Sequence, residues 1–293
     1  MKAPTNTSLL IALLGISISA NAAPVAPSDV SGLDIWLTDA GNQFDGTTWL
    51  DASGNSNDAT AVGSRLAGGT GFPAVTYLAG TASTQFGTAG VAFSGSADDL
   101  MTAGSFAGES AVTIITAYST DTAASDTRPV GLGSQAAKGA GTSGLFNLAT
   151  DGSLRYDNGN DGGNNNPTGQ LLVRASRLDG GTVTDWLDDG TGLSTNIGPT
   201  SGSAPNPLGA DADALYLGDV RAGATAVGGG GTTVSTADLF ISQVAVFKGA
   251  LTDTEVADVS SWMATNPSAI PEPASSAFLF GGLALLALLR RRR

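Results

Sequence analysis

The 293-residue sequence has no cysteine, no histidine and very little glutamate, and these absences exclude much of enzyme chemistry. Without His or Cys, the chain cannot form a Ser-His-Asp triad, a Cys-His pair, a reactive thiolate or an ordinary zinc or copper site. Glutamate occurs only at Glu109, Glu255 and Glu272. Since most glycosidases work with two neighbouring carboxyl groups, this scarcity makes a paired-Glu centre hard to build.

Basic residues are also few. The chain has 13 Lys and Arg against 26 Asp and Glu, for a net charge of −13. Such a surface repels the phosphates of nucleic acids and the headgroups of anionic lipids, so no nucleic acid partner is expected. The hydrophobic content of 41% is enough to bury a sizeable core.

Residues 1–22 have the pattern of a secretory signal peptide. Lys2 supplies the positive charge, Leu9–Ile18 is apolar, and Ala20-Asn21-Ala22 is a small-x-small cleavage site. The alternative is a membrane anchor, but a run of ten apolar residues is too short to cross the ~30 Å hydrocarbon core. We therefore expect export of the mature chain.

Residues 270–293 have the pattern of a second targeting signal. Pro271, Glu272 and Pro273 precede the apolar segment Ala274–Leu289. The chain then ends in four consecutive arginines: Arg290, Arg291, Arg292 and Arg293. This order resembles the PEP-CTERM sorting signal of Gram-negative bacteria.

The resemblance implies passage through the export machinery, transient arrest in the inner membrane and processing by an exosortase. Proteins of this family often reach the cell surface or the exopolysaccharide matrix. Cytoplasmic arginines fit the arrest, and a 16-residue helix at ~1.5 Å per residue is only a marginal anchor. A plain C-terminal transmembrane tail is the alternative.

Between the two ends, short apolar runs alternate with clusters of Gly, Asn, Asp, Ser and Thr, which predicts an all-β sandwich or barrel. In one of these runs, Val112, Ile114, Thr116 and Tyr118 should share one face of the sheet. The predicted strands cover Leu33–Leu37, Ala111–Tyr118, Leu145–Ala149, Leu171–Arg177, Val183–Leu187, Leu215–Leu217 and Leu239–Phe247.

A single helix is predicted near the end of the sandwich. Thr252 and Glu255 form a capping box, and Val256, Val259 and Met263 recur on one face. The helix should cover the end of the sandwich and stop before Pro267.

The order of these segments resembles LamG-like, concanavalin A-like jelly-roll domains over residues 28–266. The resemblance rests on Gly32–Leu37, on Trp49–Ala59, on a hairpin from Leu171 to Gly190, and on the closing strand and helix. Jelly-roll glycosidases of this kind commonly carry an E-x-D-x-E strand. No such strand can be written here, so the resemblance implies a domain without that catalytic motif.

Two clusters of oxygen-bearing side chains suggest calcium, because Ca²⁺ prefers carboxylate and carbonyl ligands. Residues 51–58 contain Asp51 and Asp58, but Asp, Asn and Gly at this spacing also form turns, and a structural turn is favoured. Asp157 and Asp161 could hold Ca²⁺ in a loose site, although a polar hairpin loop is the favoured interpretation.

Aromatic side chains could stack on sugars. Trp36 and Trp262 lie in apolar segments and are expected in the core, whereas Trp49 and Trp186 lie beside loops. Trp49 and Trp186 are therefore the better candidates for binding extracellular polysaccharide, although a core position is the favoured interpretation for these two residues as well.

Three functions remain open at this point. The favoured hypothesis is an exported surface or matrix protein whose non-catalytic sandwich binds glycan or protein, and which is not an enzyme. The second hypothesis is a polysaccharide-acting enzyme on a jelly-roll fold. The third is a purely structural matrix protein.

Overall fold

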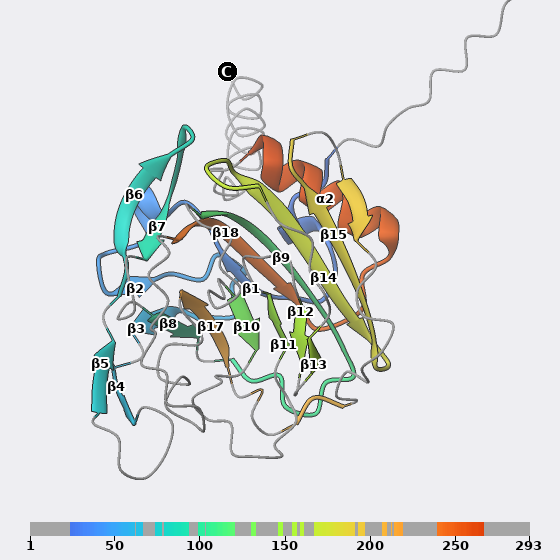
Figure 1. Ribbon diagram of the computed structural model, residues 1–293, viewed down its shortest axis with the longest axis horizontal. Coiled ribbons are helices and arrows are strands. Elements are labelled where there is room, and N and C mark those ends of the chain that lie inside the picture. Colours follow the sequence, from blue (N-terminus) through green and yellow to red (C-terminus); the bar gives the residue numbers. More distant parts are fainter. Residues whose placement is uncertain are drawn as a thin grey trace, which may run out of the picture.

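The computed structural model folds the middle of the chain into two antiparallel β-sheets that lie face to face, with a helix on the outer side of one sheet (Figure 1). It describes residues 24–61, 63–66, 74–77, 79–93, 99–102, 104–120, 130–132, 146–148, 154–156, 159–160, 167–190, 193–196, 207–209, 212, 214–218 and 239–266. The short η1 (Pro27–Asp29) precedes the first strand.

We call the sheet beneath the helix sheet A. Its strands are β1 (Leu33–Leu37), β6 (Thr81–Gln85), β7 (Thr88–Phe93), β9 (Ala111–Thr120), β14 (Leu172–Asp179), β15 (Thr182–Asp188), β16 (Leu193–Asn196) and β18 (Leu239–Phe247). They run in the order β16-β15-β14-β9-β18-β7-β6, and β1 also pairs with β18. The bounds predicted for β1 and β18 are confirmed.

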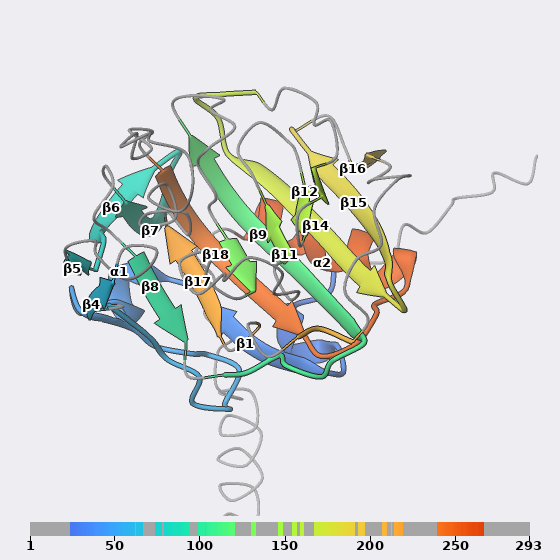
Figure 2. The same ribbon diagram turned by 60° about the horizontal axis from the view of Figure 1, so that its bottom comes forward.

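The facing sheet, sheet B, has shorter strands. They are β2 (Thr48–Trp49), β3 (Ala59–Ala61), β8 (Asp99–Thr102), β10 (Val130–Leu132), β11 (Phe146–Leu148), β12 (Leu154–Tyr156), β13 (Gly159–Asn160) and β17 (Leu215–Gly218). Their order is β13-β12-β11-β10-β17-β8-β3-β2. A separate hairpin joins β4 (Gly63–Leu66) to β5 (Ala74–Tyr77), and Figure 2 shows it at one side of the sandwich.

The main core lies between the two sheets. Strand β9 shows why, because its apolar residues alternate between two faces. Val112, Ile114 and Tyr118 point into the core shared with sheet B, while Ile115 and Ala117 join a second core on the outer face. The predicted two-faced pattern of this strand is therefore confirmed.

The outer face of sheet A is covered by helix α2 (Asp253–Thr265), which is visible behind the sheet in Figure 1. Its Val256, Val259 and Met263 are buried in the second core, and its predicted capping box is present. The expected position at the end of the sandwich is wrong, because the apolar outer residues of β9, β14 and β18 provide a larger surface to cover. Within the described residues no helix is long and apolar enough to cross a membrane.

One side of the sandwich is formed by the two end strands, β6 of sheet A and β2 of sheet B. Next to β6, strand β7 packs closely on β18 at Gly90. A Cβ atom there would lie 2.5 Å from the Phe240 ring and would overlap the backbone oxygen of Ile241. Near the same side lies the short helix α1 (Ala40–Gln43), which was not predicted.

Candidate functional site

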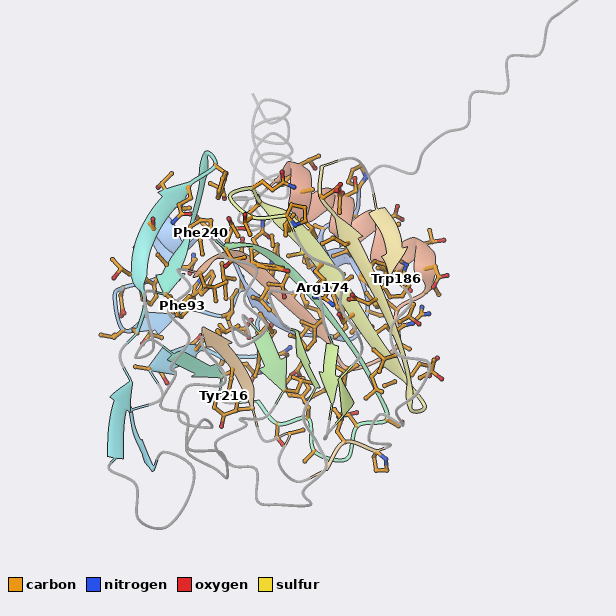
Figure 3. All side chains as sticks on the ribbon, viewed as in Figure 1. Phe93, Arg174, Trp186, Tyr216 and Phe240 are labelled. Atoms are coloured by element: carbon orange, nitrogen blue, oxygen red, sulfur yellow. The ribbon has the colours of Figure 1, made fainter. Side chains whose placement is uncertain are left out.

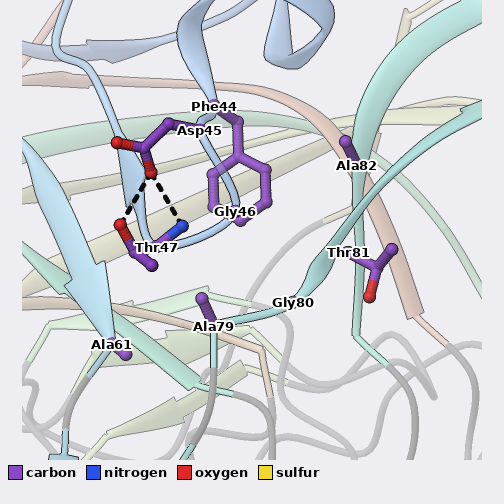
Figure 4. A pocket seen from close by; sticks show the side chains of 9 residues that line it. All are labelled: Phe44, Asp45, Gly46, Thr47, Ala61, Ala79, Gly80, Thr81 and Ala82. Carbon is purple, nitrogen blue, oxygen red and sulfur yellow. Dashed lines mark hydrogen bonds between the residues drawn. The ribbon is translucent and has the colours of Figure 1, made fainter.

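A pocket of about 670 Å³ opens on this side, between parts of the two sheets (Figure 4). We call it the edge pocket. One wall is the turn before β2, with Phe44, Asp45, Gly46 and Thr47, and the opposite wall belongs to the segment that leads into β6. The complete lining is Phe44, Asp45, Gly46, Thr47, Ala61, Ala79, Gly80, Thr81 and Ala82.

The turn that carries Asp45 is closed by hydrogen bonds from the next two residues to the Asp45 side chain. Asp45 Oδ1 accepts hydrogen bonds from Thr47 N at 2.8 Å, Thr47 Oγ1 at 2.7 Å and Thr48 N at 2.8 Å. Gly46 takes a φ of 93°, a backbone conformation that glycine adopts without strain. An isolated bridge between Phe44 and Trp49 closes the turn.

The same hydrogen bonds favour the charged form of Asp45. The hydroxyl and the N–H of Thr47, followed by the N–H of Thr48, lower the pKa of Asp45 below its ordinary value of 3.8. The carboxylate is therefore ionised at neutral pH. All three bonds found for it go to Oδ1, which leaves Oδ2 as an acceptor for hydroxyl groups of a ligand.

The opposite wall adds small and neutral groups. Ala79, Gly80, Thr81 and Ala82 line it, and Thr81 and Ala82 are exposed. Gly80 is needed here because a Cβ would lie 2.5 Å from Val91 Cγ1 and 2.6 Å from the backbone oxygen of Ala92. The pocket thus combines one fixed carboxylate, threonine hydroxyls and apolar surface, a set that suits an uncharged polyhydroxylated ligand.

The cluster around Asp51 is a structural turn, as the sequence favoured. Asp51 Oδ1 accepts from Trp36 N at 2.8 Å and Ser53 N at 2.9 Å, and Oδ2 accepts from Ser53 Oγ at 2.7 Å and Asn57 N at 3.0 Å. Asp58 Oδ1 accepts from Asp51 N. The oxygens are used by the chain itself.

The two candidate tryptophans lie in the packed interior. Trp49 is 0% exposed in the main core, and its Nε1 donates to the backbone oxygen of Thr38 at 2.9 Å. Trp186 is 5% exposed in the second core, and Arg177 covers its ring at 4.9 Å from the centroid. The favoured core position is confirmed for both residues, and the alternative of an exposed sugar-binding ring is wrong, because both lie on strands whose neighbours cover them.

The calcium candidates Asp157 and Asp161 lie outside the described residues, as do Pro271, Glu272, Pro273 and Arg290 to Arg293. Among the residues that are described, no group of three or more acidic side chains gathers at one point where a metal ion could bind.

A buried charge pair, Arg174 of β14 and Asp185 of β15, lies on the inner face of sheet A, and Figure 3 labels Arg174 between Phe240 and Trp186. Arg174 Nη2 lies 2.6 Å from Asp185 Oδ2, and both side chains are at most 2% exposed. Burial by itself lowers the pKa of Arg174, but the charge of Asp185 reverses this effect and raises it. The pair is therefore closed to solvent in the folded chain.

The pocket residues were missed by sequence reasoning. The dipeptide Asp45-Gly46, placed between Phe44 and Trp49, is a turn signal that could have located one wall. Nothing local could have paired that turn with residues 79–82, because the contact between them depends on the packing of the sheets.

Comparison of the sequence finds no matching protein family and no matching curated protein. Comparison of the fold finds domain 4 of AbnA, a GH43 extracellular arabinanase from Geobacillus stearothermophilus, in complex with arabinotriose. The TM-score is 0.51 at 16% identity, over 78% of this chain and 98% of the AbnA domain.

A GH54 α-L-arabinofuranosidase is similar with a TM-score of 0.50 at 16% identity, over 76% of this chain. This chain spans 51% of that enzyme's length. At this identity the likeness establishes the fold, a β-sandwich that occurs in carbohydrate-active proteins.

These neighbours contradict the expectation of a non-catalytic protein that is not an enzyme. Both come from glycoside hydrolases, and they favour the second hypothesis, a polysaccharide-acting protein. The absence of paired Glu residues was given too much weight, because one carboxyl group of such a pair can be an Asp, and Asp is abundant here.

Proposed function

We propose that this protein acts on polysaccharide as an enzyme of the glycoside hydrolase kind, with a sugar residue in the edge pocket. The observation that carries the proposal is Asp45, an ionised carboxylate fixed by its own turn in a pocket of otherwise neutral groups. Carboxylates accept strong hydrogen bonds from hydroxyl groups, and sugars offer these in pairs. The finer fold that fits this function is the LamG-like, concanavalin A-like jelly roll.

Asp45 also suits the chemistry of glycoside cleavage. Positive charge develops on the sugar ring in the transition state, and a nearby carboxylate stabilises that charge. Because hydrogen bonds lower its pKa, Asp45 would act as the ionised member of the carboxyl pair. The proton for the leaving oxygen would have to come from a second acidic group, which the other residues lining the edge pocket do not include.

Arabinose-containing polysaccharide is the first substrate class to test. The two similar structures support this choice, since one is an arabinofuranosidase and the other is an arabinanase domain that holds arabinotriose.

The location that we propose follows from the two ends of the chain. The signal-like residues 1–22 support export, and residues 270–293 support transient anchoring in the inner membrane and exosortase processing. A polysaccharide-acting protein at the cell surface would then meet its substrate outside the cell.

The first prediction tests the pocket with the variant Asp45→Asn. For the wild-type protein, calorimetry should detect binding of arabinotriose, and an assay for released reducing ends should detect cleavage of arabinan. The variant should bind about tenfold more weakly or worse, because a hydrogen bond to a charged group is worth about 1.5 to 3 kcal/mol. Turnover should fall with it.

Asp29→Asn is the matched control, because Asp29 is an exposed aspartate in η1 and outside the pocket. It should leave binding and turnover unchanged. If wild-type protein neither binds nor cleaves any glycan of a broad array, the proposed function is wrong.

A further inference from the structure

The hairpin of β6 and β7 has a large aromatic side chain at its tip. Phe86 is 50% exposed, and Leu50 is the other large hydrophobic residue that is exposed among the described residues. An exposed ring loses the benefit of burial, so its presence at the tip calls for a physical reason.

The backbone at this tip is strained as well. Gln85 pairs with Thr88, so Phe86 and Gly87 form a two-residue turn, and their φ angles are 53° and 76°. Positive φ at both positions defines a type I′ turn, in which Asn-Gly is the favoured sequence. A bulky residue with positive φ is uncommon because its Cβ crowds the backbone.

Strain together with exposure means that Phe86 does not serve the stability of the hairpin. Asparagine at this position would remove the strain and the exposed ring together. Such outliers persist mainly where function requires them, so the observation leads to a hypothesis of binding.

Strand β6, whose last residue Gln85 directly precedes Phe86, begins at the edge pocket. Thr81 and Ala82 line the pocket, and Phe86 follows five residues after Thr81, which at ~3.3 Å per residue places it about 17 Å away. Strand β6 is an end strand of sheet A, and its residues Thr81, Ala82 and Thr84 are exposed. One open strand therefore connects the pocket to the ring.

The chemistry of the hairpin selects the ligand. Residues 79–93 contain no charged side chain, and the residues along β6 are threonine, serine, alanine and glutamine. Hydroxyl and amide groups form hydrogen bonds with sugar hydroxyls, and an aromatic face packs on the C–H groups of a sugar ring. A neutral surface on an acidic protein matches a neutral, extended glycan.

We propose that β6 is a binding track for the polysaccharide and that Phe86 stacks on a sugar ring several residues from the one in the edge pocket. This inference rests on the proposed function and adds to it a preference for long chains. Phe86 contributes only when the ligand extends beyond the pocket.

The test compares the wild-type full-length chain with Phe86→Asn, which creates the favoured Asn-Gly turn. We expect the variant to melt about 2 °C higher or more, because turn strain is removed. We also expect it to bind polymeric arabinan about five- to tenfold more weakly, with affinity for monomeric arabinose unchanged. A gain in stability together with a loss of polymer affinity cannot result from damage to the fold.

Two further variants complete the test. Phe86→Tyr should keep polymer affinity, because the ring is retained, and Leu50→Asn should change nothing, because Leu50 lies outside β6. If Asp45→Asn weakens binding while Phe86→Asn leaves polymer affinity unchanged, the track is wrong and the proposed function stands. If Phe86→Asn instead abolishes self-association or attachment to vesicles without affecting glycan affinity, the ring serves a protein or membrane contact and the inference is overturned.

Discussion

Arg174 and Asp185 form a buried ion pair on the inner face of sheet A. Arg174 Nε donates to Asp185 Oδ1 at 2.9 Å, and Ser176 Oγ donates to the same oxygen at 2.6 Å. Burial raises the pKa of Asp185, while Arg174 and Ser176 oppose that change. Because desolvation of two charges is costly, such a pair need not add stability, but either partner left alone is strongly unfavourable.

The corresponding prediction is a non-additive pair of mutations. Arg174→Met should lower the free energy of unfolding by about 3 to 5 kcal/mol, because it leaves a buried carboxylate without its cation. The double variant Arg174→Met, Asp185→Leu should lose less than Arg174→Met alone. Urea unfolding measures both values, and a double variant that loses as much stability as Arg174→Met, or more, would contradict the prediction.

At the scale of elements, helix α2 depends on its capping box. Thr252 Oγ1 accepts from Glu255 N at 3.3 Å, and Thr252 N donates to Glu255 Oε2 at 2.8 Å. The backbone and side chain of Thr252 lower the pKa of Glu255 below its ordinary value of 4.5. This contact therefore stabilises the folded protein at pH values above 4.5, the pKa of Glu255 in the unfolded chain. The stabilisation is lost as the pH falls through the lower pKa of the folded state.

Two measurements check this contact. Thr252→Ala should destabilise the protein by about 1 kcal/mol at neutral pH, whereas Thr254→Ala, an exposed threonine within the helix, should have little effect. The stability difference between wild type and Glu255→Gln should shrink on acidification. A difference that stays constant in acid would mean that the carboxylate does not contribute through its charge.

How far a strand could be predicted depended on its burial. Strands β9 and β18 lie in the middle of sheet A, are rich in Val and Ile, and were located from their apolar runs. Strand β6, with the sequence TASTQ, has no apolar residue larger than alanine because it is an end strand open to solvent. Its strand conformation comes from pairing with β7, a tertiary contact that no local pattern contains.

At the scale of the whole molecule, the edge pocket could not be predicted because it also depends on a tertiary contact. Phe44 and Thr81 lie far apart in sequence and meet because β2 and β6 are the end strands of two facing sheets. The core position favoured for the two tryptophans, by contrast, could be predicted from residue type alone. Trp49 and Trp186 are adjacent to loops in sequence, but their large apolar rings are buried by the sheets.

The ends of the chain give the last prediction, which concerns location. If residues 270–293 form a sorting signal, the wild-type protein should lose this segment and leave the inner membrane. Replacing Arg290 to Arg293 with glutamine should weaken retention, because each arginine resists passage through the bilayer centre by about 2.5 to 3.5 kcal/mol.

Glu272→Gln separates sorting from simple anchoring. The residue lies outside the apolar segment Ala274–Leu289, so membrane insertion should be unchanged, while exosortase processing should stop and the full-length form should accumulate in the inner membrane. Fractionation and mass measurement of wild type, Glu272→Gln and the arginine variant, each with an epitope inserted at Gly228, compare the three forms. Release of Glu272→Gln at the same mass as wild type would exclude the sorting signal, since a plain apolar tail has no use for a carboxylate at that position.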